Sequence, residues 1–286
     1  MAESYKIIAE QDYCTVVAKY ESSRKNGNAY QSEQDLERWL IEQLQRQGYE
    51  YPSIHNEKEL LENLRIQLGK ANDTEYSDKE WQSLLDILTG ETLTMEDKAG
   101  MIQKENTAVE IERDNGINTN VHLIHKDNVF KNNLQVINQY VPAGGTHANR
   151  YDVTILVNGL PLVHIELKRR GVSIREAFNQ INRYARESFW AGKGMFDYIQ
   201  LFVISNGTET KYYSNTTRYA RELEADKQKG KKKKIQSNSF EFTSYWSDRE
   251  NNLICDLEDF AKTFLVKRTL LEILTKYCVF NVDKEL

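Results

Sequence analysis

One aspartate, one glutamate and one lysine lie within seventeen positions of this chain: Asp152, Glu166 and Lys168. Two carboxylates held about 4 Å apart repel by about 4 kcal/mol at an effective dielectric constant near 20. Mg²⁺ converts that repulsion into binding, because it prefers oxygen ligands, usually one or two carboxylates completed by water and substrate phosphate. A nearby ammonium group can orient water or neutralise charge that develops on phosphorus. The three residues therefore suit metal-assisted phosphodiester cleavage, and a plain surface ion pair between Glu166 and Lys168 is the alternative.

A predicted hairpin positions these side chains. Residues 151–157 and 161–169 have strand-like patterns, and Asn158-Gly159 between them is a strong turn signal. A plain two-residue loop pairs Asp152 with Ile165 and separates the carboxylates. A three-residue loop or one bulge pairs Asp152 with Glu166 instead.

The hydrophobic pattern favours the second register, because only that register gathers the apolar side chains on one face. We therefore predict an odd-length or bulged turn. The predicted apolar face contains Val153, Ile155, Val157, Val163, Ile165 and Leu167, and the predicted polar face contains Asp152, His164, Glu166 and Lys168.

A helix is predicted over residues 173–189. Gln180 and Tyr184 are four positions apart, so they share one flank of it. Such a pair most often only marks the edge of the helix's apolar stripe. Beside a metal site, however, it can hold a phosphate or the strand backbone. The apolar stripe that should pack on the sheet comprises Ile174, Ala177, Phe178, Ile181, Ala185 and Phe189.

Other polar residues are weaker site candidates. Glu33 and Glu37 lie on a predicted helix and could add carboxylates to a metal site, although solvated helix glutamates are commoner. His122 and His125 are three apart on a predicted strand, so they should face opposite sides. His147 lies in a glycine-containing loop before Asp152 and could touch substrate.

Composition indicates an ordinary soluble protein. The chain has 286 residues, of which 28% are charged and 40% hydrophobic, and its three cysteines form no disulfide or zinc pattern. It contains neither an apolar run of about 20 residues nor a signal-peptide pattern. We therefore expect a cytoplasmic protein without a membrane span.

The net charge of −5 hides an asymmetry along the chain. Residues 1–120 carry 13 basic and 24 acidic side chains, whereas residues 168–234 carry 16 basic and 7 acidic ones. A polyanion bound at Glu166 would meet this basic block. Its lysine run at 229–234 is typical of a solvated loop, whereas five arginines lie on or beside the predicted site elements: Arg169, Arg170, Arg175, Arg183 and Arg186.

The remaining pattern indicates a helical start and an α/β core. Helices are predicted after Ser32, over residues 57–68 and after Ser77. Strands are predicted at 109–113, 121–125, 133–140, 198–206, 210–214 and near 240–246, followed by helices at 253–266 and 267–280.

These motifs resemble those of a known family. Asp152 is followed by VTILVNGLPLVHIELK, and QINRY at 180–184 matches a QxxxY motif. NLQVINQY, FVISNGTETKYY and FLVKRTLLEILTKYCVF support the match, which covers most of the chain and is weakest across 50–105. The sequence resembles the N-terminal nuclease region of the R (motor and restriction) subunit of type I restriction-modification enzymes.

The resemblance implies a restriction-endonuclease-like fold of the PD-(D/E)xK nucleases, a mixed sheet flanked by helices, here with an extra N-terminal helical region. It implies Asp152 and Glu166 as Mg²⁺ ligands, Lys168 as the catalytic lysine, and Gln180 and Tyr184 as DNA-contacting or supporting residues. Tyr151 stands where the superfamily name has proline. The expected parts are 1–106, mainly helical, 107–250, the nuclease core, and 251–286, helices leading toward a motor.

The implied function is Mg²⁺-dependent cutting of double-stranded DNA without intrinsic sequence choice. The partners implied are the methyltransferase and specificity subunits, and ATP enters only through motor lobes that this sequence lacks. We therefore expect an excised fragment or a natural truncation. A non-catalytic module that docks DNA or methyltransferase subunits is the main alternative, favoured by the acidic N-terminal region, and a DNA-repair nuclease is another.

Overall fold

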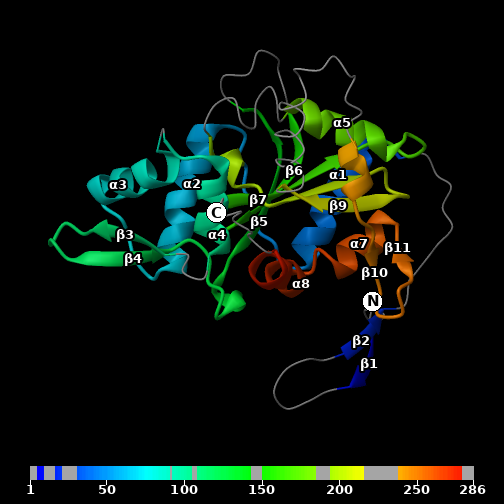
Figure 1. Ribbon diagram of the computed structural model, residues 1–286, viewed down its shortest axis with the longest axis horizontal. Helices are drawn as coiled ribbons and strands as arrows, with labels where there is room; N and C mark the ends of the chain where they lie inside the picture. Colours follow the sequence, from blue (N-terminus) through cyan, green and yellow to red (C-terminus); the bar gives the residue numbers. More distant parts are fainter. Residues whose placement is uncertain are drawn as a thin grey trace, which may run out of the picture.

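The computed structural model describes residues 5–9, 17–20, 31–90, 92–104, 108–142, 150–184, 194–215 and 238–278. Its centre is a five-stranded sheet in the order β5-β6-β7-β8-β9 (Figure 1). The β7–β8 pair is parallel and the other three pairs are antiparallel, which confirms the predicted mixed sheet. The strands are β5 (Leu134–Tyr140), β6 (Tyr151–Val157), β7 (Leu160–Leu167), β8 (Leu201–Ser205) and β9 (Thr210–Ser214).

The hairpin of β6 and β7 contains the predicted bulge. Asn158 and Gly159 both have positive φ, at 50° and 85°, as a tight two-residue turn requires. Val157 pairs with Leu160, but Ile155 pairs with Val163, so Leu162 is one extra residue on β7. Val153 consequently pairs with Ile165, and the register that faces Asp152 toward Glu166 is confirmed.

Helix α5 (Ile174–Tyr184) connects the parallel strands β7 and β8. It covers the sheet face that carries His164. The Tyr184 ring lies edge-on to the His164 ring, with centroids 6.2 Å apart, and the Phe178 and Tyr213 ring centroids are 5.3 Å apart. The predicted stripe residues Ile174, Ala177, Phe178 and Ile181 are buried. Ala185 and Phe189 lie outside the described residues.

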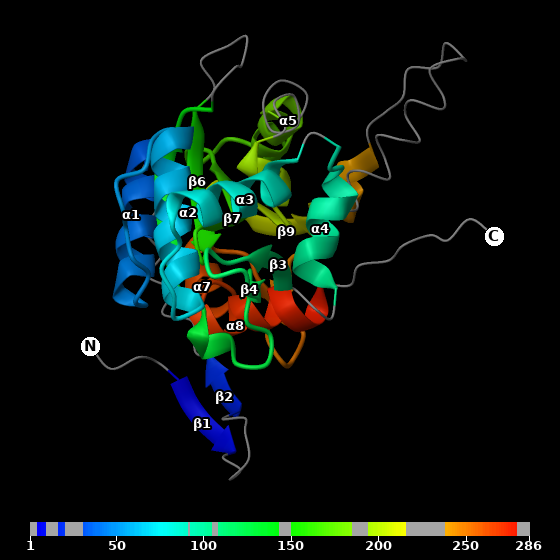
Figure 2. The ribbon, with the colours of Figure 1, turned by 90° about the vertical axis from the view of Figure 1, so that its left-hand side faces the viewer.

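In the described part of the chain, four helices precede the sheet in sequence: α1 (Glu33–Arg46), α2 (Glu57–Ala71), α3 (Asp78–Thr89) and α4 (Met95–Gln103). Helices α1 and α3 begin after Ser32 and Ser77, as predicted, and both serines form capping boxes. Figure 2 shows α1 and α2 on the opposite side of β6 and β7 from α5. The buried leucines of these helices, among them Leu40, Leu44 and Leu64, belong to the same apolar core as the strands.

Several peripheral expectations differ from the structure. A hairpin, β1 (Tyr5–Ala9) with β2 (Val17–Tyr20), precedes the helices. The strand expected at 121–125 lies at β4 (Asn118–His122), paired with β3 (Ala108–Glu112). The strand expected near 240–246 begins as a 3₁₀ turn at Asn238–Phe242. Ser244 then makes a single antiparallel bridge to Tyr212 of β9, and β10 (Trp246–Ser247) pairs with β11 (Leu253–Ile254).

The C-terminal helices are shorter than expected: α7 (Leu257–Thr263) and α8 (Lys267–Glu272), the latter continuing as a π-helical turn at Ile273–Tyr277. Among the described residues, no helix combines the length and apolar character needed to cross a bilayer. The three-part division at 106 and 250 stays a prediction.

Candidate active site

The β6–β7 hairpin brings Asp152 and Glu166 together. Asp152 is the second residue of β6, and Glu166 is next to last on β7, where its side chain is fully buried. The Leu167 N–H donates a 2.9 Å hydrogen bond to Asp152 Oδ2, which ties the start of β6 to the end of β7. The backbone of β7 thus fixes the aspartate beside the glutamate.

Lys168 lies at the same end of β7 and is only 8% exposed. Its Nζ is 3.4 Å from Glu166 Oε1 and donates a 2.9 Å hydrogen bond to the Leu167 carbonyl. Glu33 Oε1, from the first turn of α1, is 3.6 Å away. The ammonium group is therefore held against the carboxylates and not in open solvent.

Burial perturbs the ionisation of the acidic pair. Desolvation raises the pKa of Glu166 to about 8, although Lys168 and a hydrogen bond with Asp152 oppose the rise. Desolvation and the nearby Glu166 charge also raise the pKa of Asp152 well above its usual value. The two carboxyl groups therefore hold less negative charge at neutral pH than two exposed ones would.

His164 lies beneath the pair on the same sheet face. Its Nε2 is 3.3 Å from Glu166 Oε2, and its Nδ1 is 3.4 Å from Thr154 Oγ1. Complete burial lowers the pKa of His164 to about 4, so the ring is neutral at pH 7. A neutral imidazole adds no positive charge to compensate the carboxylates.

Gln180 and Tyr184 reach the backbone just before Asp152. Gln180 Nε2 donates to Tyr184 Oη, which in turn donates a 2.9 Å hydrogen bond to the Arg150 carbonyl. The Tyr184 ring also packs against Tyr151, with centroids 5.1 Å apart. The pair therefore holds the backbone directly before β6.

Of the two candidate glutamates on α1, only one is solvated as expected. Glu33 is 45% exposed, although it lies close to Lys168, whereas Glu37 is 8% exposed and accepts hydrogen bonds from Asn138 and Gln139 on β5. The sequence did contain the signal, because Glu37 lies within the apolar stripe of α1, between Leu36 and Leu40.

The donor set suits a hard cation. It consists of two desolvated carboxyl groups, and their raised pKa values show that little positive charge lies nearby to stabilise the ionised forms. A divalent ion would supply that positive charge. Within the described ranges, no group of three or more acidic, histidine or cysteine side chains is arranged to hold a metal. Two protein carboxylates with water and phosphate is the usual Mg²⁺ arrangement.

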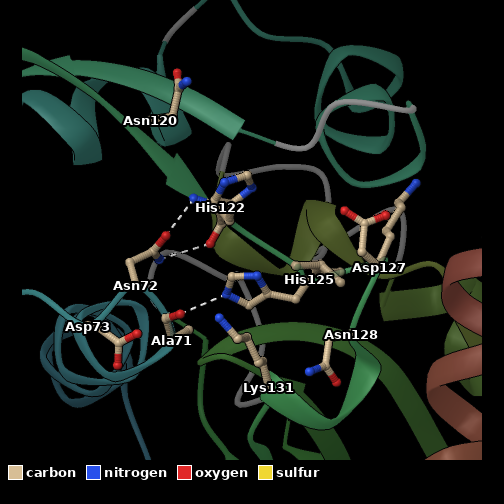
Figure 3. Close-up of a pocket in the computed structure, with 11 residues that line it drawn as sticks. Ala71, Asn72, Asp73, Asn120, His122, His125, Asp127, Asn128 and Lys131 are labelled. Atoms are coloured by element: carbon tan, nitrogen blue, oxygen red, sulfur yellow. Dashed lines mark hydrogen bonds between the residues drawn. The ribbon is translucent and has the colours of Figure 1, made fainter.

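A separate cavity of about 710 Å³ lies between the end of α2, β4 and the segment that follows β4. Figure 3 shows the residues that line it. His122 and His125 line it, with ring centroids 5.3 Å apart, and His125 Nε2 contacts the Ala71 carbonyl at 2.7 Å. His125 follows the end of β4, so the expected strand alternation does not apply to it. The cavity adjoins the Asn158 turn, roughly 20 Å along β6 from Asp152, and is not the carboxylate site.

Basic side chains continue from the carboxylates across the sheet. Glu166 pairs with Ile204, and Ile204 with Lys211 on β9, so Lys211 shares the face of Glu166 at roughly 10 Å. The Lys211 ammonium and the Arg175 guanidinium lie 5.0 and 4.3 Å from the Phe240 ring centroid. Arg170 instead approaches Asp256, with Nη2 3.8 Å from Oδ2.

Three further candidates for contact with substrate or DNA lie outside the described residues: His147, Arg186 and the lysine run 229–234.

Comparison with known proteins finds one family. Residues 30–221 match the family described as type I restriction enzyme R protein N terminus. The chain is 45% identical over 292 residues to an Escherichia coli protein, the type I restriction enzyme EcoprrI endonuclease subunit, and covers 86% of it. It is 38% identical over 258 residues to the SauMSSORF170P endonuclease subunit of Staphylococcus aureus strain MSSA476, of which it covers 25%.

Proposed function

The chain belongs to the family of N-terminal regions of type I restriction enzyme R proteins, and we propose that it is a Mg²⁺-dependent DNA endonuclease module. The observation that carries the proposal is the buried Asp152–Glu166 pair with Lys168 against it at one end of the sheet. A PD-(D/E)xK nuclease uses this set of side chains to cut phosphodiesters, as the sequence motifs imply.

Mg²⁺, held by Asp152 and Glu166, would supply Lewis acidity toward the scissile phosphate. Lys168 orients the attacking water and offsets charge that develops on the phosphate oxygens, because its Nζ is fixed by the Leu167 carbonyl. Gln180 and Tyr184 hold the Arg150 backbone and thereby the start of β6. Solvent protonates the leaving 3′ oxygen.

The substrate in this proposal is the sugar-phosphate backbone of double-stranded DNA. Lys211 and Arg175 continue the positive charge of Lys168 along the sheet face, where neighbouring phosphates can contact them. Phosphate contacts position a protein on DNA without reading bases. Sequence choice therefore belongs to another subunit of the restriction enzyme.

The complete enzyme in this proposal joins the nuclease to an ATP-driven translocase and to methyltransferase and specificity subunits. The chain spans only about a quarter of the S. aureus relative, which leaves room there for further domains. ATP acts through the translocase, and the residues described above contribute the cutting step.

Replacing Asp152 tests the function directly. In the complete enzyme, Asp152→Asn is expected to lower DNA cleavage at least a hundredfold while ATP hydrolysis continues, because one of two ligand carboxylates is lost. Lys58→Ala, an exposed change on α2, is the matched control and should cut at the wild-type rate. Wild-type cutting by Asp152→Asn would refute the assignment.

Metal titration separates the nuclease from the docking alternative. Calorimetry of the chain with Mn²⁺ or Mg²⁺ should give binding that Glu166→Ala abolishes. Absence of metal binding, together with tight binding of the methyltransferase subunits, would instead favour a non-catalytic docking module.

A further inference from the structure

Glu37 is a buried carboxylate outside the Asp152–Glu166–Lys168 set. Its two oxygens accept hydrogen bonds from two successive residues of β5: Asn138 Nδ2 contacts Oε1, and Gln139 Nε2 contacts Oε2 at 2.5 Å. Tyr51 donates to Asn138 Oδ1 at 2.7 Å, which fixes the orientation of that amide. Glu37 therefore links α1 to β5 at one defined point.

Two successive residues of a regular strand cannot both reach one side chain, because their side chains point to opposite faces. The backbone at Gln139 is irregular, with φ of 53°, in the left-handed region that non-glycine residues rarely adopt. This conformation turns the Gln139 side chain toward α1 together with that of Asn138. The hydrogen bond to Glu37 offsets the cost of the conformation.

Gln139 lies directly opposite Asp152. The pairs on either side of it are Asn138 with Val153 and Tyr140 with Tyr151. In a regular strand its side chain would stand on the face of Asp152, with the two Cβ atoms roughly 5 Å apart. The left-handed turn removes a glutamine side chain from the space beside the catalytic carboxylate.

We propose that Glu37 is a positioning residue for the nuclease, which holds Gln139 turned toward α1 so that the face beside Asp152 stays open to metal and DNA phosphate. This inference rests on the proposed function. It gives Glu37 a role that requires neither a metal contact nor a proton transfer.

Glu37→Met tests the role, since methionine has a similar length and suits the apolar neighbours of α1 but accepts no amide hydrogen bond. In the complete enzyme, cleavage is expected to fall at least tenfold with ATP hydrolysis unchanged. Glu37→Gln is expected to retain cleavage within about threefold, because its amide accepts from Asn138 and donates to a flipped Gln139 amide. Glu42→Gln, an exposed change on α1, controls for helix effects.

A second substitution distinguishes positioning from general stability. Glycine adopts positive φ freely and has no side chain to place beside Asp152. Adding Gln139→Gly to Glu37→Met should therefore restore cleavage to within about threefold of wild type, although it restores no contact to α1. A double variant as slow as Glu37→Met, or a Glu37→Met enzyme that cuts at the wild-type rate, would overturn the inference.

If Glu37→Met does not fold, Gln139→Leu supplies the same test from β5, because leucine at this position favours the regular strand and would occupy the face of Asp152. It should also lose at least tenfold in cleavage, and wild-type cutting would overturn the inference. Asp152→Asn is measured in parallel. Wild-type cutting by that variant refutes the proposed function, whereas an inactive Asp152→Asn with a fully active Glu37→Met refutes only the role of Glu37.

Discussion

At the level of single residues, the buried acidic groups of the candidate site lower the unfolding free energy of the metal-free protein. Glu166 is fully buried, and only one cation, Lys168, lies within 4 Å of its carboxylate among the described residues. Its neighbour His164 is neutral at pH 7, and its neighbour Asp152 is acidic. Such an arrangement is costly for the metal-free protein and suits one that binds a divalent cation.

Glu166→Gln should therefore stabilise the metal-free chain above neutral pH. The pKa of Glu166 rises from an ordinary 4.5 to about 8 on folding, so the folded state binds this proton more tightly than the unfolded state. Stability accordingly falls as pH increases from about 4.5 to about 8. At pH 8 the variant should gain about 4 kcal/mol in unfolding free energy, and at pH 4.5 less than about 0.5 kcal/mol.

Urea unfolding in the presence of a chelator, at both pH values, measures this difference. Glu42→Gln, an exposed glutamate on α1, should change stability little at either pH. A Glu166→Gln protein that is less stable than wild type at pH 8 would contradict the desolvation argument.

At the level of elements, local patterns predicted the sheet core well. Alternation of apolar residues specified the bulged register of β6 and β7, because the plain two-residue register would put Val153 and Ile165 on opposite faces of the sheet. Ser32 and Ser77, as N-cap residues ahead of apolar stripes, predicted two helix starts. These signals lie within a few residues of the structure that they specify.

Tertiary contacts were harder to predict. The apolar stripe of α1 indicates that Glu37 is buried, but its hydrogen-bond partners on β5 and the positive φ of Gln139 belong to a contact between distant segments that no local pattern encodes. The residues near 240–246 look strand-like because they are aromatic, yet Phe240 packs on Phe178 of α5 from within a 3₁₀ turn. Glu166 and Lys211 lie on the same sheet face because each is opposite Ile204, and this arrangement likewise depends on the order of the strands.

The turn of the β6–β7 hairpin gives a prediction about stability. A Cβ at Gly159 would lie 2.7 Å from Leu64 Cα, and the φ of 85° disfavours any other residue. Gly159→Ala should therefore cost about 3 kcal/mol of unfolding free energy. Gly116, with φ of 77° and open space around it, is the matched control, and Gly116→Ala should cost only about 1 kcal/mol.

Thermal or urea unfolding of the two alanine variants compares them. Equal costs would mean that the close approach of α2 to the hairpin turn does not constrain this position.

At the level of the whole molecule, opposite charges are segregated along the chain. The N-terminal 120 residues carry 24 acidic and 13 basic side chains, whereas the excess of basic residues follows Glu166. Within the described part of that basic region, Arg175 and Lys211 flank the Phe240 ring on the face of the carboxylates. The molecule therefore presents positive charge where, in the proposed function, the phosphates of bound DNA would lie.

The double variant Arg175→Ala, Lys211→Ala should bind duplex DNA more weakly, to a similar extent for unrelated sequences. If each side chain contacts one phosphate, the slope of log affinity against log salt should become shallower by about 2. Fluorescence anisotropy at several salt concentrations measures both quantities. Arg38→Ala on α1 should leave the slope unchanged, and an unchanged slope in the double variant would place the DNA elsewhere.

The central claim is that Lys168 and the two carboxylates beside it cut DNA. Its most direct test is cleavage of plasmid DNA by the complete enzyme carrying Lys168→Ala, with ATP hydrolysis measured on the same sample. Our interpretation predicts that cleavage falls at least a hundredfold while ATP hydrolysis and the melting temperature stay near wild type, because the alanine leaves the metal ligands in place but removes the ammonium group. Cleavage at the wild-type rate by that variant would contradict it.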